Sequence, residues 1–183
     1  MRSALALLLL GLVSMGEGTA LASQTDPRLD ALFAELLAAQ DPGGAAGIEA
    51  KIWAIWLESE DPFVEGQLSL GVDAMNQQDF RKALTAFDAL VAKRENFAEG
   101  WNRRATLFYL MGDFAASVAD IRRTLELEPR HFGALSGLAL IREAQRRPFE
   151  ALEALEKVMS IHPQMPQLGE RVDQLTAQLG EAI

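Results

Sequence analysis

The chain has 183 residues, of which 49% are hydrophobic and 23% charged, so it is long enough to bury the core of an ordinary domain. Its net charge of −9 argues against nucleic acid and anionic membrane surfaces as partners, because both attract basic proteins. The absence of cysteine excludes disulfides, thiolate metal sites and lipid attachment through an N-terminal cysteine.

Residues 1–22 have the form of a secretory signal. Arg2 precedes a short apolar run over residues 4–13, and alanines stand three residues and one residue before Ser23. We expect cleavage between Ala22 and Ser23, no membrane insertion after it, and a location in the periplasm of a Gram-negative bacterium. An uncleaved N-terminal anchor is the alternative, although the apolar run is too short to span a bilayer comfortably.

Residues 23–63 are predicted to form a helical hairpin. Asp-Pro sequences open its first helix and end its second, and the Asp-Pro-Gly-Gly sequence at residues 41–44 is a strong turn signal. Trp53 and Trp56 lie three residues apart and therefore share one helix face. Two interpretations stay open: the two rings pack against the first helix of the segment that follows, or they form an aromatic platform for a ligand.

From Val64 to Met165 the chain repeats every 34 residues, each copy predicted as helix, turn and helix. Three places keep their character in all copies, two of them small and one large. The small places are Gly71, Ala105 and Ala139, then Ala83, Ser117 and Ala151, and the large place is Phe87, Ile121 and Leu155. Small side chains at fixed places indicate helices that cross closely.

The middle copy, residues 98–131, resembles the tetratricopeptide repeat. It keeps the residues typical of that pattern: Trp101, Ala105, Phe108, Ser117, Ile121 and Pro129. It departs from the pattern at Arg104, where leucine is usual, and the first copy has Glu95 where proline is usual. The resemblance implies an all-α, right-handed superhelix of stacked hairpins, with repeats over residues 64–97, 98–131 and 132–165.

Both ends of such an array are expected to be atypical. The hairpin of residues 23–63 fits a degenerate further repeat stacked ahead of the first, with its register slipped by one residue. Residues 166–183 carry Leu168, Val172, Leu175 and Leu179 at helical spacing. They are therefore predicted to form a capping helix that covers the last apolar face.

No catalytic constellation is evident, so the chain is not expected to be an enzyme and neither a metal nor a cofactor is implied. The two histidines, His131 and His162, stand beside the ends of repeats, where packing is the more common role. Most carboxylates fall on helix exteriors and are interpreted as a solvated face.

The resemblance implies that the second, fifth, ninth and twelfth places of each repeat line a concave groove. The candidate partner-binding residues are Leu68, Val72, Met75, Asn102, Thr106, Tyr109, Ser136 and Leu140. Glu65, Glu99, Gly133 and Glu143 occupy the remaining groove places. Apolar and hydrogen-bonding side chains together suit an extended or helical peptide.

Three functions follow as hypotheses. The first is a periplasmic adaptor that binds a protein or peptide segment in the groove. The second is a self-associating component of a cell-envelope complex, whose oligomeric state the sequence leaves open. The third is a small-ligand binder or enzyme that uses Glu99 or Glu143 near Tyr109.

Overall fold

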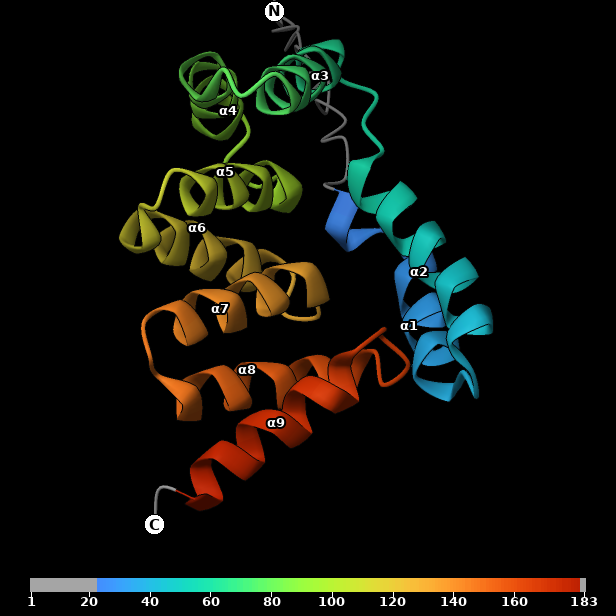
Figure 1. Ribbon diagram of the computed structural model, residues 1–183. Coiled ribbons are helices and arrows are strands. Elements are labelled where there is room, and N and C mark those ends of the chain that lie inside the picture. The colour runs from blue at the N-terminus through green and yellow to red at the C-terminus, as the bar shows by residue number, and fades with distance from the viewer. Residues whose placement is uncertain (1–22, 182–183) are drawn as a thin grey trace, which may run out of the picture.

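The computed structural model describes residues 23–181, and the predicted signal at residues 1–22 lies outside them. The described residues form a short 3-10 helix, η1, and nine α-helices, without a strand (Figure 1). The bounds are η1 Ser23–Thr25, α1 Arg28–Ala38, α2 Pro42–Leu57, α3 Pro62–Asn76, α4 Phe80–Lys93, α5 Ala98–Leu110, α6 Phe114–Leu127, α7 Phe132–Ala144, α8 Pro148–Ile161 and α9 Leu168–Glu181. Within this part of the chain, every helix is too short or too polar to cross a membrane.

Three helical hairpins, α3–α4, α5–α6 and α7–α8, stack in chain order, and α9 packs against α8 (Figure 1). We call α3, α5 and α7 the A helices, and α4, α6 and α8 the B helices. The predicted all-α superhelix is therefore confirmed. The predicted capping helix is α9, which buries Leu168, Leu175 and Leu179.

The three turns inside the hairpins share one backbone geometry. Gln78, Gly112 and Arg146, each 34 residues apart, adopt left-handed φ values of 60°, 78° and 57°. In each turn the residue after the left-handed one donates its backbone N–H to the carbonyl five residues before it. In the second hairpin, Asp113 N–H donates to the Phe108 carbonyl at 2.9 Å. Helix α6 then starts with the carboxylate of Asp113 accepting from Ala116 N–H, and α4 starts in the same way.

The small residues face the large ones inside each hairpin. A Cβ added at Gly71 would lie 2.3 Å from Cε1 of Phe87, closer than any real contact. In the next hairpin, Ala105 shares a core with the smaller Ile121, and both are buried. The first repeat therefore needs glycine at this place because its partner is a phenylalanine.

The N-terminal hairpin lies beside the stack and not on its end (Figure 1). We call η1, α1 and α2, residues 23–57, the N-terminal strap. Its buried side chains belong to the core of α7, α8 and α9: Leu29, Phe33, Leu36, Ile52 and Trp56. The expectation that this hairpin stacks ahead of α3 as a further repeat is wrong.

The exposed outer face of α3 explains this position. Gly66, Leu70 and Asp73 occupy the third, seventh and tenth places of the first repeat, and all three are exposed. At the tenth place the second and third repeats bury Leu107 and Ile141 against the preceding B helix. Since Asp73 offers a carboxylate where those repeats offer an apolar side chain, a helix stacked there would bury an unpaired charge.

The strap contacts all three loops that join a B helix to the following helix. We call these loops, residues 94–97, 128–131 and 162–167, the corners. Gln24 accepts a hydrogen bond from Ala98 N–H, next to the first corner, and donates one to the carbonyl of Asn96. Asp30 pairs with Arg130 of the second corner at 2.7 Å, and Glu49 lies 3.2 Å from His162 of the third.

The two strap tryptophans pack in the core, as the first interpretation predicted, but their partners are the second corner and α7 instead of the first helix of the first repeat. Trp56 is 1% exposed, and its ring stacks on His131 with centroids 4.1 Å apart. Trp53 meets Phe132 edge-on at 5.5 Å and fills the space above Gly133. The rings therefore hold the strap on the stack and do not face the first repeat.

Candidate functional site

The candidate residues on α3 lie at the boundary between core and surface. Leu68 is 8% exposed and belongs to the core of the first hairpin, which includes Phe87. Val72 and Met75 pack against the same core but stay partly exposed. Of the three candidate residues on this helix, only these two could give a partner apolar contact area.

The candidate residues on α5 differ in whether their polar groups are available to hydrogen-bond with a partner. Asn102 is buried, and its amide donates to Oε2 of Glu99 at 2.9 Å. Thr106 is exposed and donates to the carbonyl of Asn102 at 3.0 Å, which leaves its hydroxyl oxygen able to accept. The half-buried ring of Tyr109 packs against Phe114 at 5.7 Å. A partner therefore meets Thr106 and one side of Tyr109, and not the amide of Asn102.

The candidate residues on α7 are more accessible. Leu140 is 42% exposed, and Ser136 is partly buried with its hydroxyl 3.6 Å from the sulfur of Met165. We call the accessible members of the predicted set the A-helix wall. It consists of Val72, Met75, Thr106, Tyr109, Ser136 and Leu140.

Behind this wall, a buried polar cluster surrounds Glu99, whose side chain is fully buried. His131 Nδ1 accepts a hydrogen bond from Ala134 N–H, so the ring proton lies on Nε2, which donates to Glu99 at 3.1 Å. Arg103 pairs with the other carboxylate oxygen at 2.6 Å. The predicted packing role of His131 is confirmed, because the ring caps α7 and anchors Glu99.

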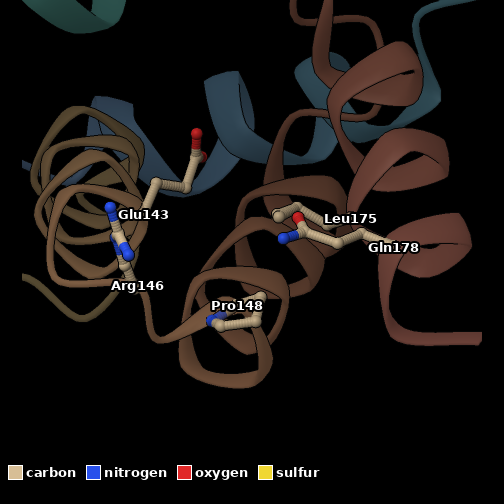
Figure 2. Close-up of a pocket in the computed structure, with 5 residues that line it drawn as sticks. All are labelled: Glu143, Arg146, Pro148, Leu175 and Gln178. Carbon is tan, nitrogen blue, oxygen red and sulfur yellow. The ribbon is translucent and has the colours of Figure 1, made fainter. Parts of the chain in front are cut away.

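A cleft of about 470 Å³ opens where α7 ends, lined by Glu143, Arg146, Pro148, Leu175 and Gln178. Figure 2 shows Leu175 and Gln178 projecting from α9 toward Arg146 and Pro148. Glu143 pairs with Arg171 of α9. The cleft thus combines an apolar floor with charged and amide groups at its rim.

The carboxylates considered for chemistry are engaged in structural contacts. Glu99 is enclosed by His131, Asn102 and Arg103, and Glu143 is paired with Arg171. Over residues 23–181 no group of three or more suitable side chains is placed to hold a metal ion.

Comparison with known proteins assigns the repeats to a family. The family model described as tetratricopeptide repeat matches residues 68–110 and 102–166, which together exceed half of the chain. The chain belongs to the tetratricopeptide repeat (TPR) family. The comparisons indicate no enzyme family.

A similar chain is a TPR repeat-containing protein of Rhizobium etli, 35% identical over 157 residues, which cover 86% of this chain and 77% of that protein. Among solved TPR structures, MamA aligns with 86% of this chain and 83% of its own, with a TM-score of 0.59 and 20% identity. The first TPR of Spaghetti (RPAP3), solved with an HSP90 peptide, aligns with 62% of this chain and 93% of its own, with a TM-score of 0.58 and 18% identity. At these identities the structures show the fold alone.

Sequence reasoning missed the cleft, because its residues come from a turn and from the capping helix. One signal was available: Arg146 stands at the turn place where the middle TPR repeat has Gly112. This signal is not specific, because Gln78 also adopts a left-handed φ at this place in the first repeat.

Proposed function

We propose that this TPR protein is a non-catalytic interaction module that holds a protein or peptide segment on its A-helix wall. The observation that carries the proposal is the composition of that wall. Val72, Met75 and Leu140 offer apolar area beside the hydroxyls of Thr106 and Tyr109. Apolar surface with a few placed polar groups is typical of peptide sites.

The solved relatives support the same class of partner. Spaghetti was solved with an HSP90 peptide, and the TPR2B domain of yeast Sti1 in a complex with pHsp70. On α5 of this chain, Arg103 is already paired with Glu99. We therefore propose a largely apolar contact with the partner along the wall.

We further propose that the protein works in the periplasm as an adaptor. The support is the signal-like sequence of residues 1–22. Osmotic-shock fractionation of a Gram-negative host should release the protein, and its intact mass should correspond to a chain beginning at Ser23. Retention in the cytoplasm with Met1 present would contradict this location.

Crosslinking in living cells tests the binding surface. A photoreactive residue at Thr106 or Leu140 should capture a specific partner, whereas one at Glu153, exposed on α8, should not. Leu140→Asp should abolish capture from Thr106. Leu37→Asp is the matched control, because Leu37 is also exposed but lies on α1. Equal capture from Thr106 and Glu153 would refute the proposal.

A second candidate function, self-association, is favoured by a different surface. Leu110, Met111 and Phe149 are 50%, 45% and 69% exposed and lie at the turns inside the second and third hairpins. If they form a fixed interface, light scattering should give a multiple of the chain mass. Phe149→Ser together with Leu110→Ser should then return the monomer.

A further inference from the structure

The cleft at the end of α7 is lined by one acidic and one basic side chain, Glu143 and Arg146, in a protein whose net charge is −9. Glu143 pairs with Arg171, and Glu150 is shared by Arg142, at 3.0 Å, and Arg147. Both glutamates are thus already paired with arginines other than Arg146.

Arg146 is the source of the unpaired charge. Among residues 23–181 its guanidinium has neither an ion pair nor a hydrogen bond, although it lines the cleft. The side-chain amide of Gln178, on the opposite side, also lacks a hydrogen-bond partner within the described chain. Figure 2 shows both groups beside Pro148, and Leu175 next to Gln178. The cleft thus offers two hydrogen-bond donor groups that have no partner among the described residues, beside the apolar side chains of Pro148 and Leu175.

The backbone at Arg146 has the left-handed conformation that the turns of all three hairpins share. Its φ of 57° is the left-handed conformation that Gly112 adopts in the second repeat without a Cβ penalty. Gln78 adopts the same conformation in the first repeat, so what distinguishes Arg146 is its guanidinium at the cleft, which is unpaired within the part of the chain that the structure describes.

We propose that this cleft binds an acidic side chain of the partner segment, with Arg146 and Gln178 donating to its carboxylate. Pro148 and Leu175 contact the aliphatic part of that side chain and an apolar neighbour. Charge complementarity selects this occupant, because a guanidinium donates charge-assisted hydrogen bonds to a carboxylate. The inference rests on the proposed function, since it assigns the chemistry at one end of the segment that the A-helix wall holds.

Two short peptides with blocked ends test the chemistry: Gly-Leu-Glu-Leu-Gly and Gly-Leu-Gln-Leu-Gly. Titration into the 15N-labelled protein should shift the Arg146 Nε–H and Gln178 amide signals. We expect the glutamine peptide to bind roughly tenfold more weakly, because it loses the charge-assisted bond. Equal binding of the two peptides would overturn the inference. So would the absence of shifts at these signals, or tighter binding of unblocked Gly-Leu-Gln-Leu, which would indicate a terminal carboxylate.

Arg146→Gly is the decisive variant, because it removes the guanidinium and places the residue of Gly112 in an equivalent turn. The variant should fold with a raised melting temperature and lose the shifts at Gln178. Gln78→Gly makes the same change in the first repeat, where φ is 60°, and should raise the melting temperature while leaving peptide binding unchanged. Peptide binding that survives Arg146→Gly would overturn the inference.

The same variant separates this inference from the proposed function. If Thr106 captures the same partner equally well in the wild type and in Arg146→Gly, the cleft has no part in binding while the A-helix wall keeps its role. If neither Thr106 nor Leu140 captures any partner, the proposed function itself fails.

Discussion

At the scale of single residues, the packing of Gly71 against Phe87 illustrates what the repeat pattern encodes. The pattern predicts a small residue at this place in every copy, and alanine serves in the other two. The structure adds that glycine is required in the first repeat, because a Cβ would lie 2.3 Å from the Phe87 ring. The size of one side chain thus depends on a partner 16 residues away in the sequence.

Gly71→Ala should therefore destabilise the protein by about 1–3 kcal/mol, the usual cost of overpacking a core. Gly66→Ala on the same helix is the control: nothing lies within 4 Å of its added Cβ, so better helix propensity should stabilise by up to about 1 kcal/mol. Urea unfolding followed by ellipticity measures both. Phe87→Leu, which imitates the Ala139–Leu155 pair, should recover part of the loss. Equal stability of the two alanine variants would contradict this account.

At the scale of elements, most helix boundaries could be predicted because local chemistry sets them. Asp79, Asp113 and the Asp-Pro pairs at residues 41–42 and 61–62 start helices, and the turn residues between A and B helices stop them. The position of the N-terminal hairpin could not be predicted in the same way. An amphipathic pattern shows which face of a helix is buried, but not against which partner.

The sequence nevertheless held a sign of the empty face of α3. Asp73 stands at the place that is apolar in the next two repeats, where Leu107 and Ile141 are buried. Reading the repeats for this face, in addition to the small and large places, predicts that the hairpin of α1 and α2 does not stack on it. The residues of the A-helix wall could be predicted from the family resemblance. The cleft could not be predicted, because its lining forms only where α7 and α9 meet in three dimensions.

The start of α3 gives a prediction about acid stability. A backbone hydrogen bond from Phe63 and the neighbouring Arg94 hold the pKa of Asp61 below its ordinary value of 3.8. The unfolded chain therefore takes up this proton first as pH falls. The contribution of Asp61 is complete above pH 3.8 and disappears as pH falls through its folded pKa.

Asp61→Asn keeps a residue that can cap α3 but removes the charge that pairs with Arg94. Wild type should melt at a higher temperature than this variant near neutral pH, and the gap should close as pH falls below 3.8. Scanning calorimetry across that range measures the gap. Arg94→Gln should behave similarly, and a gap that is constant with pH would rule out the ion pair as its cause.

At the scale of the whole molecule, the N-terminal strap connects repeats that would otherwise touch only their neighbours. Its contacts reach the first corner through Gln24, the second through Trp56 and Asp30, and the third through Glu49. A repeat array without such a connection can unfold one unit at a time. We expect this chain to unfold as one cooperative unit.

Trp101→Phe provides the test, because it leaves Trp53 and Trp56 of the strap as the only tryptophans. In urea, the fluorescence of these two rings should follow the same transition as helix ellipticity, as expected when no intermediate accumulates. Adding Trp56→Ala should cost about 3–5 kcal/mol, the range for a large buried aromatic. A fluorescence transition at lower urea than the ellipticity transition would show that the strap detaches first.

The contacts of α2 also relate the length of the N-terminal hairpin to the number of repeats in the stack. Glu49 and Trp56 meet successive corners, and seven residues of α-helix rise about 10 Å, close to the spacing of packed helices. The lengths of α1 and α2 therefore match the number of repeats beside them. If one 34-residue unit were duplicated, α1 and α2 would each be too short, by about two helical turns, to reach the added corner. Gain or loss of a repeat in evolution should therefore be accompanied by a matching change near the N-terminus.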